Sequence, residues 1–286
     1  MNRSQTIKSL IIVPTIGFLV ALAGSQNGLD FNGYPIFAIC VAMAFLVNWI
    51  AFVPAYRMQS EKFYDFTGSL TYISVTIVAL LLSGKFDLRS MILTTLVMIW
   101  AIRLGTFLLR RVQKAGKDDR FDAIKPDFYR FLNAWTIQAL WVTLTAAPAF
   151  IAISSAKVVE IGPLAIAGIV VWLLGFSVEV VADQQKTQFR KDPANREKFI
   201  SSGLWSRSRH PNYFGEIVLW VGVTLIALPV LQGWQWVALI SPLFVFLLLT
   251  RVSGVPMLEA KAEKKWGGQD EYESYKANTP VLIPKL

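Results

Sequence analysis

The chain has 286 residues, of which 54% are hydrophobic and only 16% are charged, and its formal net charge is +9. This composition excludes an ordinary soluble domain. It contains one histidine and one cysteine. A Cys/His metal site and an internal disulfide are therefore excluded, and no metal is predicted. Cys40 lies in an apolar segment and is predicted to be a core residue.

Apolar segments of about 20 residues, the length that crosses a bilayer core of roughly 30 Å, recur along the whole chain. The first has a basic start and an Ala21-Leu22-Ala23 ending, as secretory signals do, but the seven that follow favour a retained helix. The fold class is therefore all-α integral membrane, a polytopic bundle of seven to eight transmembrane helices with cytoplasmic loops capping a cavity. The predicted spans are 8–24, 34–54, 66–84, 89–109, 131–153, 163–183, 213–231 and 234–250.

The basic residues predict how the chain crosses the membrane. Of the 28 Lys and Arg residues, 24 lie in the N-terminus and in the segments after the second, fourth, sixth and eighth spans. By the positive-inside rule both termini face the cytoplasm, so the positive charge reports topology and no nucleic-acid partner is predicted. Three cytoplasmic segments, 110–130, 184–212 and the tail after Arg251, are predicted to form one cap. The Pro211-Asn212 break is a candidate for irregular backbone lining a cavity.

Polar residues inside the spans fall at helical spacing and so share faces. Because lipid cannot solvate them, we expect these faces to line an interior cavity. Ser69 and Thr76 could instead bond back to their own helix, and Glu179, Asp183 and Lys186 could be a helix-end ion-pair set. The stripes are Asp65, Ser69, Tyr72 and Thr76; Trp100, Arg103, Phe107 and Arg110; Glu179, Asp183, Lys186 and Arg190; and Asn212 with Glu216.

Two common enzyme sites are not indicated. No GxGxxG motif follows a strand, and His210 has no Ser or Cys nucleophile signature around it. A cationic mouth above a polar, aromatic-lined cavity remains. Such a mouth suits a phosphorylated or carboxylated cofactor, and the cavity suits an apolar substrate with one polar handle.

Several motifs together resemble the steroid 5α-reductase family, and most closely its bacterial DUF1295 branch. They are Trp100-x-x-Arg103, KDDRF at 117–121, LWSRSRHPNYFGE at 204–216, Arg251 and the terminal YESYKANTPVLIP. The resemblance covers roughly residues 60–286. Residues 1–60 are thus predicted to be N-terminal transmembrane helices, and 61–286 a reductase-like catalytic domain. RHPxYxG alone is less specific, because isoprenylcysteine carboxyl methyltransferases carry it too.

The resemblance implies an integral-membrane oxidoreductase that uses NADPH to reduce the activated C=C bond of a 3-oxo-4-ene steroid or similar lipophilic enone. It also implies a bacterial inner membrane, a cytoplasmic cofactor site and membrane lipid as surroundings. Arg190 is the expected partner of the 2′-phosphate, because guanidinium matches phosphate geometry. The implied cofactor-binding residues are Arg103, Asp183, Arg190, Arg207, His210, Asn212, Tyr213, Glu216, Arg251 and Tyr275.

The implied catalytic residues are Asp65, Tyr72 and Trp100, placed at the substrate carbonyl. Trp100 stands where the animal enzymes have a tyrosine, and an indole can donate a hydrogen bond but cannot act as a general acid. Either Tyr72 supplies the phenol, or the substrate is not a 4-ene-3-one.

Two other functions are considered. A membrane methyltransferase using S-adenosylmethionine is supported by RHPNYFG and by Glu259, although paired glutamates are usual there and this chain has Glu259-Ala-Lys. A carrier or channel would be expected to show internal pseudo-symmetry, and no repeat is found.

Overall fold

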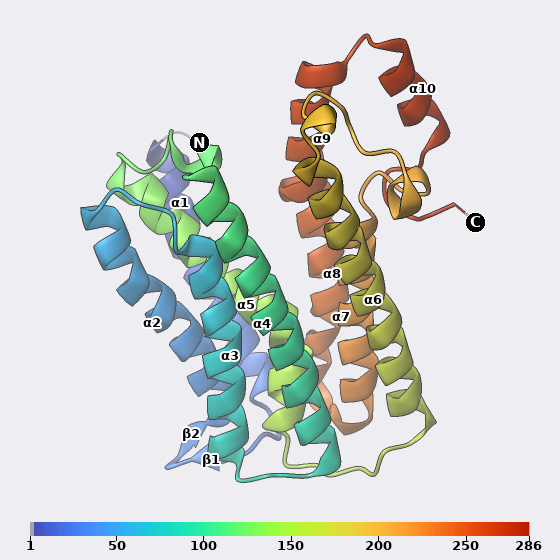
Figure 1. Ribbon diagram of the computed structural model, residues 1–286. Helices are drawn as coiled ribbons and strands as arrows, with labels where there is room; N and C mark the ends of the chain where they lie inside the picture. Colours follow the sequence, from blue (N-terminus) through green and yellow to red (C-terminus); the bar gives the residue numbers. More distant parts are fainter. Residues whose placement is uncertain (1–2, 286) are drawn as a thin grey trace. The chain divides into compact units, whose positions relative to one another are not determined.

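The computed structural model describes residues 3–285, which form an integral membrane protein built almost entirely of helices (Figure 1). Eight segments within these residues are long and apolar enough to cross a membrane, which confirms the predicted number of spans. A short hairpin of two antiparallel two-residue strands, β1 (Asp30–Phe31) and β2 (Tyr34–Pro35), joins the first two helices. The first seven helices are α1 (Arg3–Gly24), α2 (Ile36–Arg57), α3 (Tyr64–Ser83), α4 (Leu88–Ala115), α5 (Phe128–Ile153), α6 (Pro163–Lys191) and α7 (Pro211–Ala227).

The eighth span is longer and less regular than the predicted 234–250. It runs from Gly233 to Trp266 and changes its helix type along the way. A 3-10 stretch (Gly233–Leu239) leads into α8 (Ile240–Leu247), then a π-helical turn (Leu248–Val252), then α9 (Gly254–Trp266). The short helix α10 (Asp270–Asn278) follows in the tail. The irregular backbone expected at Pro211-Asn212 lies here instead, because Pro211 is the first residue of α7, where its missing N–H costs nothing.

The chain folds as two compact units. The first unit is Met1–Leu164 with Ile226–Ser241, and the second is Ala165–Leu225 with Pro242–Leu286. This division differs from the predicted division at residue 60, which remains a prediction based on resemblance.

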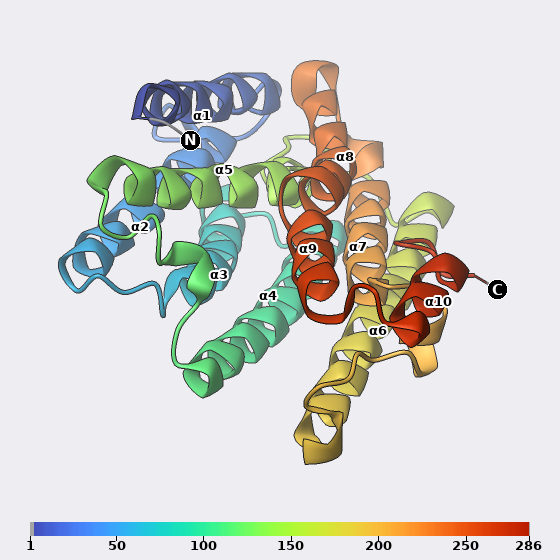
Figure 2. The same cartoon turned by 90° about the horizontal axis from the view of Figure 1, so that it is seen from above.

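Helix α5 is the core of the first unit. Figure 2 shows it with α1 on one side and α2 and α3 on the other. Nearly every residue of its second half is buried, including Ala146, Ala147 and Ala149. Small side chains let neighbouring helices approach closely, which favours helix association in lipid, where apolar burial alone gives little preference.

Hydrogen bonds made by side chains connect the helices of this unit. Asn48 Nδ2 on α2 donates to Thr71 Oγ1 on α3 at 3.3 Å, and Trp49 Nε1 donates to Thr136 Oγ1 on α5 at 3.0 Å. Gln138 Nε2 on α5 donates to the backbone oxygen of Tyr64 at 3.0 Å. Such bonds between membrane helices contribute about 0.6 kcal/mol each on average.

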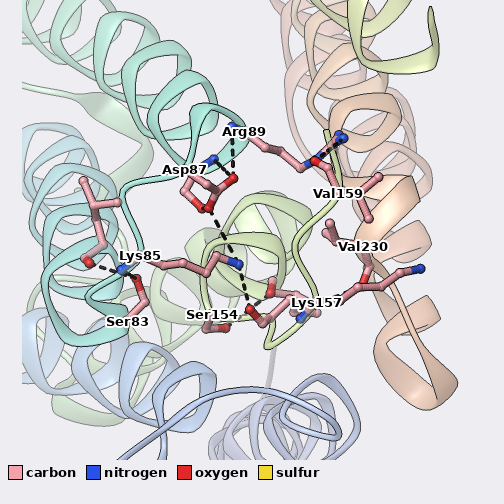
Figure 3. Close-up of polar contacts among 12 residues, drawn as sticks. Ser83, Lys85, Asp87, Arg89, Ser154, Lys157, Val159 and Val230 are labelled. Atoms are coloured by element: carbon pink, nitrogen blue, oxygen red, sulfur yellow. Dashed lines mark hydrogen bonds and ion pairs between the residues drawn. The ribbon is translucent and has the colours of Figure 1, made fainter. Parts of the chain in front are cut away.

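Two cations, the buried Arg89 and the partly buried Lys85, secure one end of the first unit (Figure 3). Arg89 is only 2% exposed, and its guanidinium donates to the backbone oxygens of Ile226, Val159 and Glu160. Lys85 Nζ donates to the backbone oxygen of Ser155 at 2.7 Å. These contacts join α4 and the loop before it to the 155–160 segment and to the end of α7.

In the second unit α6 and α7 touch backbone to backbone. A Cβ built on Gly175 would lie 2.5 Å from the amide nitrogen of Leu219, and one on Gly215 would lie 2.6 Å from that of Glu179. A Cβ on Gly222 would lie 2.6 Å from the amide nitrogen of Trp172. Only glycine fits at these contacts, so they fix the spacing of the two helices.

Candidate functional site

The glycine contact between α6 and α7 brings predicted cofactor residues side by side in the second unit. Asp183 on α6 is buried, and Asn212 Nδ2 on α7 donates to its Oδ1 at 3.2 Å. Glu179 and Glu216, also on these helices, are 2% and 9% exposed. Buried carboxylates this close to a predicted membrane interior are costly unless they are paired or bind a ligand. Asp183, Asn212 and Glu216 thus lie on facing helices, as a shared site requires.

The RHP segment before α7 is held by a residue of α9. Arg209 Nη1 donates to Glu259 Oε2 at 2.7 Å, and His210 Nε2 lies 2.7 Å from Glu259 Oε1. His210 is 4% exposed, and burial lowers its pKa below the ordinary 6.5, although the Glu259 carboxylate opposes this shift. Its Nδ1 is buried and has no hydrogen-bond partner.

Tyr213 joins this segment to the irregular part of the eighth span. Its ring stacks on His210 with the ring centroids 5.7 Å apart and the planes 10° apart. A Cβ on Gly254, which has a φ of +39°, would lie 2.9 Å from the Tyr213 ring. The π-helical turn immediately before Gly254 carries Arg251, which is exposed. π-Helical turns often occur at functional sites, so this break places Arg251 in a suitable setting.

The remaining predicted cofactor residues differ in their surroundings: the cations are exposed, whereas Tyr275 is hydrogen-bonded within the protein. Arg190 and Arg207 are exposed. Tyr275 Oη donates to the backbone oxygen of Trp205 at 2.7 Å, and burial raises the pKa of this phenol. The Tyr275 hydroxyl therefore fixes the tail to residues 203–206.

Two of the three segments predicted to form a cap do pack together. In Figure 1 the segment after α6 and the tail with α10 lie at the same end of the second unit. The Arg209 amide donates to the backbone oxygen of Pro280, and the Lys285 amide donates to that of Arg207, both at 2.9 Å. Phe199 packs between Trp266 and Tyr275. The third segment, 110–130, belongs to the first unit and is held there.

Glu61 anchors that third segment. It is 4% exposed and accepts from Lys125 Nζ at 2.6 Å and from the Asp118 amide at 2.8 Å. Burial alone would raise the pKa of this carboxyl, but the bonds from Lys125 and Asp118 outweigh it and lower the pKa below 4.5. Sequence reasoning missed Glu61. The available signal was a carboxylate in a six-residue loop close to the basic and acidic KDDRF motif.

The predicted catalytic residues and Arg103 all lie in the first unit. Tyr72 on α3 and Trp100 on α4 are buried and meet edge to face, with ring centroids 5.0 Å apart. Arg103 lies over the Phe107 ring at 5.4 Å. Asp65 is two helical turns from Tyr72, about 10 Å along α3. Its carboxylate is paired with Arg111 at 3.4 Å and Arg120 at 3.6 Å.

The structure therefore places Tyr72 in contact with Trp100, whereas Asp65 lies two helical turns away along α3. Two shallow, open pockets of about 200 and 160 Å³ also occur in the first unit, one between the loop before α3 and the end of α4, and one between α3 and α4. Asp65, Tyr72, Trp100 and Arg103 line neither of them.

The residues of the second unit fit an anionic dinucleotide in their chemistry. Arg190 and Arg207 are exposed cations that suit phosphate, and the amide of Asn212 with the buried carboxylates suits hydroxyl and amide groups. His210 Nδ1 adds a buried polar atom that still lacks a partner. Such an atom costs free energy until a ligand or water satisfies it.

Comparison with known proteins identifies the family. A family model described as "Protein of unknown function (DUF1295)" matches residues 51–279. The 3-oxo-5-alpha-steroid 4-dehydrogenase 1 of Bos taurus is 27% identical over 124 residues, 43% of each chain. The Gossypium hirsutum steroid 5-alpha-reductase DET2 is 29% identical over 119 residues, 42% of this chain and 41% of its own. The Macaca fascicularis 3-oxo-5-alpha-steroid 4-dehydrogenase 1 is 28% identical over 158 residues, which are 55% of this chain and 48% of its own.

The chain spans less than half the length of these curated relatives, and no solved structure matches it. The family match, however, covers most of the chain and includes every predicted site residue. The chain therefore belongs to the DUF1295 family, and the curated proteins it resembles are steroid 5α-reductases.

Proposed function

We propose that this protein is an NADPH-dependent reductase of a lipophilic enone, a 3-oxo-4-ene steroid or a compound of similar shape. The observation that carries the proposal is the Asp183–Asn212 contact across the close α6–α7 interface, flanked by Glu216 and by exposed arginines. The names of the curated relatives, steroid reductases and dehydrogenases, support the substrate class.

In this proposal the second unit binds the nucleotide. Arg190 would bind the 2′-phosphate, and Asp183 the adenosine side. Asn212 and Glu216 would hydrogen-bond the ribose and the nicotinamide carboxamide. When bound, NADPH would supply a hydride to the β carbon of the enone. The protein would lie in a bacterial inner membrane with the basic end of this unit on the cytoplasmic side, in keeping with the positive-inside rule.

The candidates for the groups that act on the substrate carbonyl are the residues that the family resemblance implies. Hydride addition at the β carbon builds negative charge on the carbonyl oxygen, and the enolate then takes a proton at the α carbon. An O–H or N–H donor in a dry site stabilises that charge. Tyr72 and Trp100, buried and in ring contact, are the two candidate donors. Asp65 would position the 110–130 segment through Arg111 and Arg120.

Nucleotide binding by purified protein in detergent tests the proposal. We expect the wild-type protein to bind NADPH and to prefer it over NADH. Arg190→Ala should weaken NADPH binding about 10- to 100-fold, the worth of one charge-assisted contact of about 1.5–3 kcal/mol, and should leave NADH binding almost unchanged. Glu216→Ala should weaken binding of both.

Lys191→Ala is the matched control, because Lys191 is the exposed neighbour of Arg190. Binding of S-adenosylmethionine with no binding of either nicotinamide nucleotide would refute the reductase and establish the methyltransferase. Equal effects of Arg190→Ala on NADPH and NADH would refute the role given to Arg190.

A further inference from the structure

Glu259 makes contacts that suit a positioning role. Its two carboxylate oxygens are divided between neighbouring residues: Oε2 accepts from Arg209 Nη1, and Oε1 faces His210 Nε2, each at 2.7 Å. The bond from Arg209 favours the ionised form of this carboxylate, and an ionised carboxylate can only accept hydrogen bonds. The nitrogen that faces it must therefore carry the hydrogen. The proton of a neutral imidazole is thus placed on Nε2, and Nδ1 carries the lone pair.

The surroundings of His210 hold the ring in this orientation. Its amide donates to Ser208 Oγ at 3.2 Å, and Ser208 Oγ donates to the backbone oxygen of Leu282 at 2.7 Å. The ring also stacks on Tyr213. With the backbone, one face and Nε2 all engaged, Nδ1 is the one ring nitrogen of His210 without a partner, and it is buried.

We propose that Glu259 is the positioning residue of the RHP motif: it fixes His210 as the Nε2–H tautomer, so that Nδ1 is a buried acceptor for an N–H or O–H donor of the bound ligand. The ligand half of this inference rests on the proposed function, in which the donor is a carboxamide N–H or a ribose O–H of the nucleotide. The tautomer half does not depend on the ligand. The other charges near the imidazole are those of Arg209 and Lys186, both cations, which disfavour a second proton on the ring.

Nitrogen NMR of the full chain tests the tautomer directly, because His210 is the only histidine and gives one pair of ring signals. Protein labelled with [15N]histidine in detergent at pH 7.5 should show a protonated Nε2 and an unprotonated Nδ1. Glu259→Ala should convert this pattern into a mixture of both tautomers. Glu259→Gln is the conservative variant should the alanine variant not fold, and it should reduce the preference because its amide can also donate.

Glu263→Ala is the matched control. Glu263 lies one turn further along α9 and pairs with Lys276 rather than with His210. It should leave the histidine spectrum unchanged. A protonated Nδ1 in the wild-type protein, or an unchanged spectrum in both Glu259 variants, would overturn the proposal.

Adding NADPH to the labelled wild-type protein tests the ligand half. The Nδ1 signal should move much more than the Nε2 signal as the acceptor gains its bond. If NADPH binds and Nδ1 does not move, the ligand half is wrong and the proposed function stands. If NADPH does not bind but the tautomer is as expected, the proposed function fails and takes the ligand half with it, while the positioning role of Glu259 is upheld.

Discussion

A single methyl group at Gly215 should weaken both the fold and nucleotide binding. In Gly215→Ala the new Cβ would lie 2.6 Å from the Glu179 nitrogen, whereas ordinary contacts begin at 3.4 Å. The two helix backbones must therefore separate locally by the difference, 3.4 − 2.6 = 0.8 Å. The Asn212–Asp183 bond, now 3.2 Å, would lengthen to about 4.0 Å, which is beyond hydrogen-bond range.

The expected cost follows from these two effects. Overpacking against a backbone costs about 1–3 kcal/mol, and a lost hydrogen bond about 0.5–1.5 kcal/mol. We expect Gly215→Ala to lower the free energy of unfolding by about 2–4 kcal/mol. The midpoint of thermal unfolding in detergent, together with NADPH titration of the folded protein, measures both consequences.

Alanine variants of two other glycines distinguish an effect on helix packing from an effect on the geometry of the site. A Cβ at Gly162 would meet nothing within 4 Å, so Gly162→Ala should be neutral in both assays. Gly222→Ala faces a contact as close as that of Gly215 but lies two turns further along α7. It should lower stability by a similar amount and affect NADPH binding less. If Gly215→Ala and Gly162→Ala had the same thermal midpoint and the same NADPH affinity, the close contact at Gly215 would not determine the geometry of the site.

Two further predictions concern buried charges in the first unit. Arg89→Met should lower the free energy of unfolding by about 3–5 kcal/mol, because the backbone oxygens of three residues lose a charged donor. The exposed Lys157→Met should be nearly neutral, and comparable thermal midpoints for the two variants would contradict the role of Arg89. The lowered pKa of Glu61 stabilises the fold above the ordinary value of 4.5, and this stabilisation is lost as pH falls through the folded pKa. Acid unfolding of Glu61→Gln should therefore depend less steeply on pH below 4.5 than that of the wild type, and identical slopes would rule out this contribution.

The spans could be predicted from the sequence because their cause is local. A run of about 20 apolar residues must cross or be buried, whatever the rest of the chain does. The eighth span was predicted too short for a local reason as well. Its hydropathy falls after Arg251, although the helix resumes at Gly254 and continues to Trp266.

Contacts between distant residues could not be predicted in the same way. His210 and Glu259 are 49 residues apart, and no periodicity links them. The burial of Arg89, at the predicted start of the fourth span, could not be predicted because burial is a tertiary property. The glycine interface did leave a signal: Gly168 and Gly175, like Gly215 and Gly222, are seven residues apart and so share a helix face.

The Glu259–His210 contact also bears on why the RHP motif cannot by itself identify the reaction. The motif occurs in a reductase family and in membrane methyltransferases, two classes with different cofactors. If its role here is to present a buried imidazole acceptor, that role is common to both, because each cofactor carries ribose hydroxyls. Reaction class must then depend on residues outside the motif. In the proposed function those are the exposed Arg190, as the partner of the 2′-phosphate, and the Tyr72–Trp100 pair, as the candidate donors to the substrate carbonyl. Substitutions that alter the choice between NADPH and NADH should therefore map to Arg190, whereas Glu259→Gln should weaken binding of both nucleotides.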